Sequence, residues 1–218
     1  MKLPFFYKED INLATTGFVL DEATSKHVVQ VLRMQNGEQL QLTDGNGNLF
    51  IAEITDHDKK NCIVKMVSTT FQPPSAKKII IAISLTKNAH RFEWFLEKAT
   101  EIGAGEIVPL LCGRTEKQHF RFERMKGILI SAMLQSQQSW LPVLREPLKY
   151  AAYLKSVTED NALKKFIAHC EKDEPRIQLY TYQPFSASIV LIGPEGDFTI
   201  DEIELALQNN FVDRKSVV

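Results

Sequence analysis

The stretch "SIVLIGPEGDFTIDEIELALQNN", residues 188–210, decides the fold of this chain. An apolar run ends in a glycine-rich turn and a helical pattern begins at once, an order typical of a buried strand followed by a helix in an α/β protein. Thr199 and Glu202 have the T-x-x-E spacing of a capping box, and Phe198 and Ile203 occupy the two positions of a hydrophobic staple. The pattern predicts a strand, a rigid turn and a helix that begins near Thr199.

The turn in this stretch is acidic. Turns of this kind lie at the carboxyl edge of a parallel sheet, where α/β proteins bind nucleotides with free backbone amides. This one carries Glu195 and Asp197 and matches neither G-x-G-x-x-G nor GxxxxGK[ST]. Carboxylates would repel a pyrophosphate, so a ligand without phosphate, carrying a positive charge or hydroxyls, fits better. A plain strand-to-helix turn without a ligand is an equally open reading of the turn alone.

Strands and helices alternate from Lys78 onward. This alternation predicts an α/β layer with a mainly parallel sheet and right-handed crossovers. The expected strands are "IIIAISL", "EIVPLL", "KKFIAHC" and "SIVLIG", and the expected helices cover 88–103, about 120–139 and a shorter segment after Pro147.

The helix expected at 88–103 has two distinct faces. The helical period directs one set of residues to the core, with Gly103 as the stop: Phe92, Phe95, Leu96, Ala99 and Ile102. Trp94 falls on a second face with Arg91, Lys98 and Glu101. A tryptophan among charges is either a stacking platform for a base or a residue of a subunit or helix contact, and the pattern leaves both open.

Residues 1 to about 70 have the pattern of a small β-rich unit. "GEQLQLTDGNGNLFIAEI" alternates apolar and polar residues around "DGNG", Asp44 to Gly47, which accepts the positive φ of a hairpin turn. A short helix in "TSKHVVQVLRM" leaves Arg33 at its end. Two prolines in 71–78 make that segment the best candidate linker. The sequence predicts a small barrel over 1–72 and an α/β domain over 73–218.

Composition excludes several classes of protein. The 218 residues are 44% hydrophobic and 24% charged, as in a soluble globular protein, and no apolar run suggests a membrane span or a secretory signal. We therefore expect a cytoplasmic protein. Cys62, Cys112 and Cys170 lack CxxC spacing and are interpreted as reduced strand residues, and the histidines show no paired ligand spacing, so no metal is expected.

Charge is uneven along the chain. The net charge of -1 argues against a protein that coats nucleic acid indiscriminately. The segment 114–126, however, is rich in Arg and Lys, whereas 195–204 is acidic. A polyanion should therefore meet the middle of the chain, although most charged helix starts are merely solvated.

Taken in order, these motifs resemble the ribosomal RNA small-subunit methyltransferase E family (RsmE-like, SPOUT class), which methylates N3 of a uridine in small-subunit ribosomal RNA. The resemblance runs over nearly the whole chain and rests on the following segments: "MKLPFFY", "HVVQVLRMQNGEQLQLTDGNG", "RFEWFLEKATEIGAGEIVPLL", "RTEK", "AMLQSQQSWLPVL", "FIAHC" and "LIGPEGDFTIDEIELAL". It implies an N-terminal PUA-like β-barrel for RNA, a C-terminal SPOUT-type α/β domain, S-adenosylmethionine as methyl donor and a homodimer.

The resemblance also assigns site residues. The cofactor contacts that it implies are Leu110, Leu191, Ile192, Gly193, Pro194, Glu195 and Gly196. The RNA-facing cations are Arg33, Lys87, Arg91, Arg114 and Arg124. Methylation of uridine N3 needs loss of its proton and stabilisation of the resulting anion, a catalytic role that Arg91 could fill. No general base is assigned.

Two departures from the family pattern matter. Where the family has "QSxR", this chain has glutamine at 138, so an expected cation is missing. The family continues after "NNFV" into a strand, a glycine turn and a helix that complete a trefoil knot and the cofactor site, whereas this sequence reads "DRKSVV". We expect an incomplete knot, the loss of a dimer surface and impaired activity.

Two other functions stay open. A non-catalytic RNA-binding protein would use the barrel and the basic segment without a donor, and cofactor binding would separate it from a methyltransferase. An α/β enzyme that uses a phosphate-bearing nucleotide is disfavoured by the acidic turn.

Overall fold

The computed structural model describes residues 3–11, 16–116, 118–160, 162–170 and 187–213. The chain forms two compact units, Met1–Pro74 with Met133–Leu141, and Ser75–Ala132 with Pro142–Val218. The segment between Phe71 and Lys78, predicted as a linker, is neither helix nor strand.

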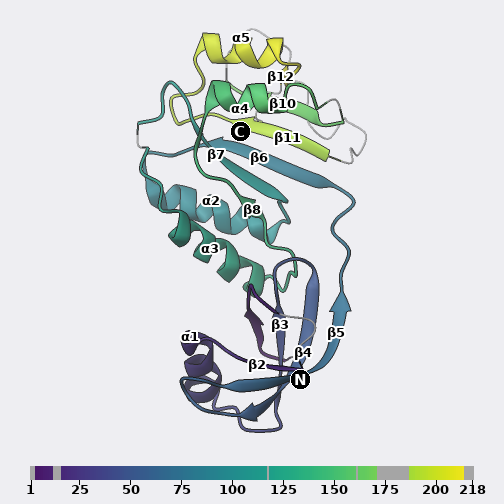
Figure 1. Cartoon of the computed structure of the whole chain (residues 1–218). Helices are drawn as coiled ribbons and strands as arrows, with labels where there is room; N and C mark the ends of the chain where they lie inside the picture. Colours follow the sequence, from purple (N-terminus) through teal and green to yellow (C-terminus); the bar gives the residue numbers. More distant parts are fainter. Residues whose placement is uncertain (1–2, 12–15, 117, 161, 171–186, 214–218) are drawn as a thin grey trace. The chain divides into compact units, whose positions relative to one another are not determined.

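The N-terminal unit is a curled five-stranded sheet (Figure 1). Its strands, in spatial order, are β1 (Phe5–Tyr7), β3 (Gln39–Thr43), β4 (Asn48–Asp56), β5 (Ile63–Phe71) and β2 (Gly17–Val19). β1 is parallel to β3 and the other pairs are antiparallel. Helix α1 (Glu22–Lys26) continues into a π-helical turn, η1 (His27–Val31). Alternate residues of β3 and β4 fill the core, as the period of two predicts: Leu40, Leu42, Phe50, Ala52 and Ile54.

The β3–β4 hairpin turns at Asp44–Gly47, as predicted. The Asp44 carboxylate accepts the Asn46 amide at 2.8 Å. Gly45 and Gly47 have φ of +75° and +88°, backbone angles that residues other than glycine rarely adopt.

A segment distant in sequence closes over this hairpin. The amide of Gly47 donates to the carbonyl of Ser139 at 2.9 Å. Trp140 donates its Nε1 proton to the Gln72 carbonyl at 3.0 Å. Residues Met133–Leu141 therefore pack with the β3–β4 hairpin inside the N-terminal unit.

The C-terminal unit is a parallel sheet with helices on both faces (Figure 1). Its strands, in spatial order, are β12 (Val212–Asp213), β10 (Lys164–Ala168), β11 (Ala187–Ile192), β6 (Lys78–Ser84) and β7 (Glu106–Leu111), with β8 (Val143–Leu144) and β9 (Leu148–Lys149) both beside β7. Its helices are α2 (Ala89–Glu101), α3 (Phe122–Gln135), α4 (Tyr150–Val157) and α5 (Ile200–Gln208).

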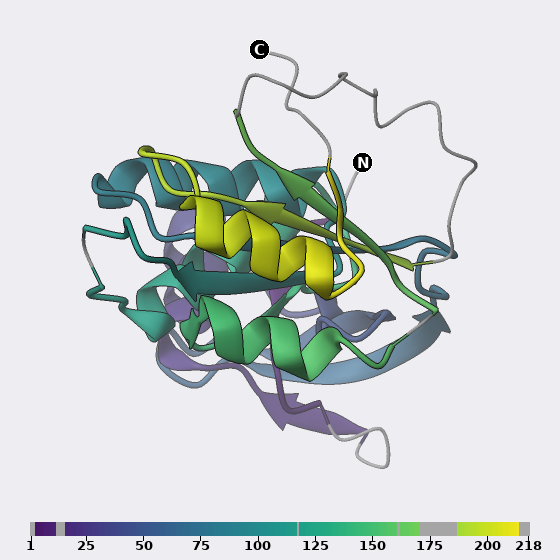
Figure 2. The same ribbon diagram turned by 90° about the horizontal axis from the view of Figure 1, so that it is seen from above.

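Strand residues alternate between the two faces of this sheet. One face packs against α4 and α5, which lie side by side in Figure 2. Its strand residues include Ile80, Ala82, Val108, Leu110, Ile189 and Leu191. Their neighbours Ile81, Ile83 and Ile107 are also buried and point to the opposite face, on the side of α2 and α3. Burial on both faces explains why these strands read as continuous apolar runs.

An ion cluster holds the amino end of β7. The Glu106 carboxylate accepts Lys78 Nζ at 3.0 Å and Arg145 Nε at 2.8 Å. Burial opposes the charge of Glu106, but the hydrogen bonds from Arg145 and Lys78 outweigh it and lower its pKa.

The predicted fold class is confirmed: a small curled β-sheet unit is followed by an α/β unit with a parallel sheet. Two details of the prediction are wrong. Ile102 is 78% exposed, because α2 ends at Glu101 and Gly103, at φ +83°, turns the chain away. The three cysteines are free but lie just beyond strand ends rather than within strands.

The predicted incomplete knot concerns the chain after β12, and residues 214–218 lie outside the described part. Among the described residues, no helix is both long and apolar enough to cross a membrane.

Candidate functional site

Four parallel strands, β6, β7, β10 and β11, end at one edge of the C-terminal sheet. From β6 the chain proceeds to β7 on one side, whereas β11 lies on the other side of β6. This reversal is a topological switch point, the usual place for a ligand in an open α/β sheet. The turn Gly193–Phe198 follows β11 at this edge.

Packing and backbone conformation fix the shape of this turn. The amide of Asp197 donates to the Pro194 carbonyl at 2.9 Å, and Asp197 itself has φ +63°. A Cβ on Gly193 would lie 3.1 Å from the Phe198 ring, whereas the nearest atom to a Cβ on Gly196 is 3.5 Å away. Gly193 is therefore the glycine that packing requires.

Helix α5 begins as the sequence predicts. Thr199 is its N-cap, and both hydrogen bonds of the capping box with Glu202 are present. Phe198 and Ile203 are 3% and 8% exposed and belong to the same core cluster. The end of the turn is thus fixed to the helix by hydrogen bonds and by apolar contacts.

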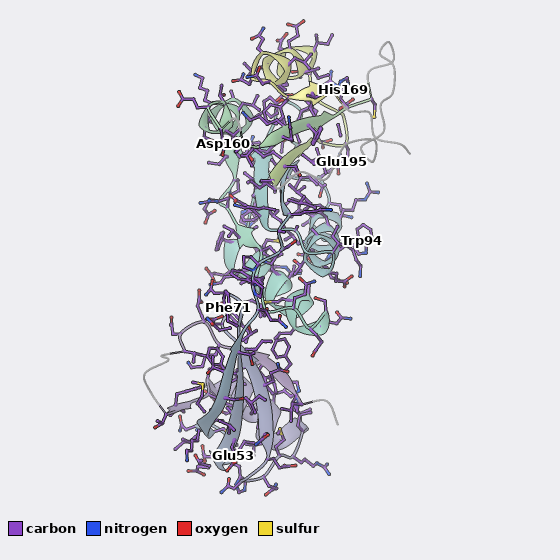
Figure 3. The ribbon with its side chains drawn as sticks, turned by 90° about the vertical axis from the view of Figure 1, so that its right-hand side faces the viewer. Glu53, Phe71, Trp94, Asp160, His169 and Glu195 are labelled. Carbon is purple, nitrogen blue, oxygen red and sulfur yellow. The ribbon has the colours of Figure 1, made fainter. Side chains whose placement is uncertain are left out.

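The acidic side chains of the turn bind backbone amides of neighbouring strand ends. The Glu195 carboxylate accepts the amide of Lys87, in the loop after β6, at 3.0 Å (Glu195 is labelled in Figure 3). The Asp197 carboxylate accepts the amide of Cys170, just after β10, at 2.8 Å. These carboxylates therefore have a structural partner each, which the sequence did not reveal.

The loop after β7, residues 112–116, is bound both to helix α5 and to the turn. Gly113 donates its amide to Glu202 at 2.7 Å. Arg114 donates Nη1 to the carbonyls of Gly196 at 2.6 Å and of Phe198 at 3.3 Å. The turn after β11 is thus connected to the ends of all three other strands.

Buried hydroxyls join the ends of β6 and β7. Ser84 Oγ and Thr115 Oγ1 lie 2.8 Å apart, and Thr115 Oγ1 also accepts the amide of Cys112 at 2.8 Å. Burial, with the nearby Glu202 carboxylate, raises the pKa of the Cys112 thiol to about 12. Cys112 is therefore protonated at neutral pH and is no nucleophile.

The residues predicted to bind a cofactor divide into two groups. Leu110 and Leu191 are fully buried in the core, so they can offer a ligand only their backbone. Ile192, at the end of β11, is half-buried. Of the turn residues, Pro194 is buried, and Glu195 and Gly196 are exposed.

The predicted RNA-facing cations differ in whether their charged groups contact other protein groups. Arg124 binds both oxygens of Glu93, at 2.6 and 3.0 Å, and this contact lowers the pKa of Glu93. Lys87 Nζ lies 2.8 Å from Glu116. With Arg114 on the turn, three of the five cations contact protein groups.

Arg33 and Arg91 are the two that remain. Both are exposed, and neither guanidinium has a partner within the part of the chain that the structure describes. Arg33 follows η1 with φ +57°, and Arg91 lies in the first turn of α2. Trp94, from the same helix, is 64% exposed (Figure 3).

The electrostatic environment of the turn is negative. Four carboxylates belong to it, against the cations Lys87 and Arg114: Glu116, Glu195, Asp197 and Glu202. The amides of Glu195 and Gly196 donate no hydrogen bond within the described residues. Free amides beside carboxylates suit a ligand that combines acceptor atoms with positive charge. Across the same residues, no group of three or more His, Cys, Asp and Glu could hold a metal ion.

A parallel sheet with an acidic turn at its switch point, preceded by a curled five-stranded sheet, defines a two-unit α/β protein with the kind of sheet edge at which such folds bind ligands. Residues 73–215 match the RNA methyltransferase domain, and residues 20–67 match the RNA methyltransferase PUA domain. The chain belongs to the RNA methyltransferase family, within its ribosomal RNA small subunit methyltransferase E group. The resemblance predicted from the sequence is confirmed.

Individual relatives are consistent with this family assignment. A ribosomal RNA small subunit methyltransferase E from Synechocystis is 31% identical over 198 residues, which cover 88% of this chain and 64% of that protein. A probable rRNA-methyltransferase from Porphyromonas gingivalis has a solved structure with a TM-score of 0.88 and 35% identity, covering 99% of this chain and 91% of that one. A Legionella pneumophila structure with bound S-adenosylmethionine has a TM-score of 0.85 and 26% identity, covering 100% of this chain and 90% of that one.

Proposed function

We propose that this chain transfers the methyl group of S-adenosylmethionine to N3 of a uridine in small-subunit ribosomal RNA. The observation that carries the proposal is the negatively charged turn Gly193–Phe198 at the switch point, bound to the ends of three other strands. Family membership supports the reaction class, and the Legionella structure supports the donor.

The residues of the turn fit this cofactor. S-adenosylmethionine has a sulfonium and an ammonium group and no phosphate, so carboxylates favour it where they would repel ATP or NAD. The free amides of Glu195 and Gly196 can donate to its acceptor atoms. When bound, the cofactor supplies an electrophilic methyl group.

Arg91 is the residue we propose for stabilising the uridine anion. Loss of the N3 proton leaves negative charge on the base, which a guanidinium within contact distance would stabilise. Arg91 is exposed, has no partner among the described residues, and stands in the first turn of α2, directly after the β6 loop.

RNA binding would use Arg33 and Arg91 first, because their guanidinium groups have no protein partner to exchange for a phosphate. Lys87, Arg114 and Arg124 would have to share or break existing contacts. We further propose that the protein acts as a homodimer in the cytoplasm, where its RNA substrate would be met.

Calorimetric titration of S-adenosylmethionine, S-adenosylhomocysteine, ATP and NAD into the chain tests the donor. We expect saturable binding of the first two only. Gly193→Ala should weaken that binding because its Cβ crowds Phe198, whereas Gly127→Ala in α3, where an added Cβ meets nothing within 4 Å, is the matched control.

Transfer is tested with purified small ribosomal subunits and donor labelled on the methyl group. Label at uridine N3 supports the proposal. RNA binding without donor binding would favour the non-catalytic alternative, and tight ATP or NAD binding would favour a phosphate-bearing nucleotide instead.

A further inference from the structure

Glu202 connects three segments of the C-terminal unit. One carboxylate oxygen accepts the amide of Gly113 at 2.7 Å, and the other accepts the amide of Thr199 at 2.9 Å. Its backbone carbonyl accepts the hydroxyl of Tyr150 at 2.8 Å. The capping box needs only the Thr199 bond, so the bond to Gly113 serves the loop after β7.

Arg114 makes the reverse connection. It follows Gly113 directly, and its Nη1 binds the carbonyls of Gly196 and Phe198. The loop is therefore held by α5 through Glu202, and it holds the turn through Arg114.

Hydrogen bonds within loop 112–115 connect its residues to one another and to the end of β6. Thr115 donates its amide to the Cys112 carbonyl at 3.1 Å and accepts the Cys112 amide on its hydroxyl at 2.8 Å. The same hydroxyl contacts Ser84 at the end of β6. A displacement of Gly113 would therefore move the loop as a unit.

We propose that Glu202 and Arg114 are positioning residues for the methyl donor, holding loop 112–115 against turn 193–198 so that both present the donor site in one geometry. This inference rests on the proposed function. It gives Arg114 a role in donor binding in place of the direct RNA contact that the family resemblance implies.

Glu202→Gln is the central variant, with Asp201→Asn as its matched control. Glutamine has one acceptor oxygen where Glu202 uses two, so one of the two amides loses its partner. Asp201 is the neighbouring, exposed carboxylate in the same helical turn, and among the described residues its side chain has no partner. Arg114→Gln removes the reverse connection.

We expect Glu202→Gln and Arg114→Gln each to weaken S-adenosylmethionine binding about tenfold, the scale of one charge-assisted hydrogen bond. Asp201→Asn should leave it unchanged. The salt dependence of binding to an oligouridylate should be unchanged in Arg114→Gln. Unchanged donor affinity in both Glu202→Gln and Arg114→Gln would overturn the inference. So would a flattened salt dependence with intact donor affinity in Arg114→Gln.

Amide hydrogen exchange separates this inference from the proposed function. Glu202→Gln should accelerate exchange in residues 112–115, and Asp201→Asn should not. If the unmodified chain binds no S-adenosylmethionine, the proposed function fails. Amide exchange then tests the structural part of the inference without the donor. Unchanged exchange of residues 112–115 in Glu202→Gln would refute the claim that Glu202 holds this loop.

Discussion

Replacing Gly47 by alanine should destabilise the N-terminal unit for two separable reasons. A side chain at φ +88° costs about 1–2 kcal/mol. The new Cβ would also lie 2.6 Å from the Gln72 carbonyl oxygen and 2.6 Å from the Trp140 ring. The ring cannot simply turn away, because its Nε1 binds the same Gln72 carbonyl. Overpacking of this kind adds about 1–3 kcal/mol.

Gly37 is the matched control, since it has φ +87° but nothing within 4 Å of a Cβ. Gly37→Ala should therefore show the conformational cost alone. Urea denaturation followed by Trp140 fluorescence, in a Trp94→Phe background, reports on this unit. With a slope of about 2 kcal/mol per M, Gly47→Ala should lower the midpoint by about 1–2.5 M and Gly37→Ala by about 0.5–1 M. Equal losses in the two variants would refute the reasoning from contacts.

Three further predictions concern other parts of the chain. Glu106→Gln should cost about 2 kcal/mol at pH 7, and because the folded-state pKa of Glu106 is lowered, the difference from the unmodified protein should shrink as the pH falls below about 4; urea midpoints across pH measure it. Thr199→Ala should cost about 1 kcal/mol by loss of the helix cap while Thr199→Ser retains most of it, as thermal denaturation would show. Arg91→Ala should lower the salt slope of RNA binding by about 1, whereas Arg124→Ala, which removes a cation already bound to Glu93, should change it less; binding titrations at several salt concentrations decide.

Local sequence signals were sufficient for the elements of this fold. The T-x-x-E spacing places the start of α5 because the two hydrogen bonds involved span only three residues. The same holds for the hairpin at Asp44–Gly47, where two glycines take positive φ. Ile102 was misplaced because the helical period was extended one residue past the end of α2. The period alone does not say where the αL residue takes over.

Long-range contacts were not predictable in this way. The bond between Glu202 and Gly113 spans 89 residues, and the pair of Arg124 with Glu93 spans 31. No spacing rule connects such positions, because the fold and not the local chain brings them together. The positive φ of the turn falls on Asp197 and not on the neighbouring Gly196, and the sequence pattern alone did not indicate this.

Glu195 and Asp197 in the turn and Glu202 in α5 affect the site in two ways. Each of Glu195, Asp197 and Glu202 binds an amide from a different strand end, so their first effect is to set the shape of the site. Their charge has a second effect, since it disfavours phosphates and favours a cation at the same place. Neutral amide side chains would weaken both effects together, because an amide group offers one acceptor oxygen and no charge. Loss of these acids, which would admit a nucleotide phosphate in place of the proposed donor, would therefore also loosen the loops that form the site.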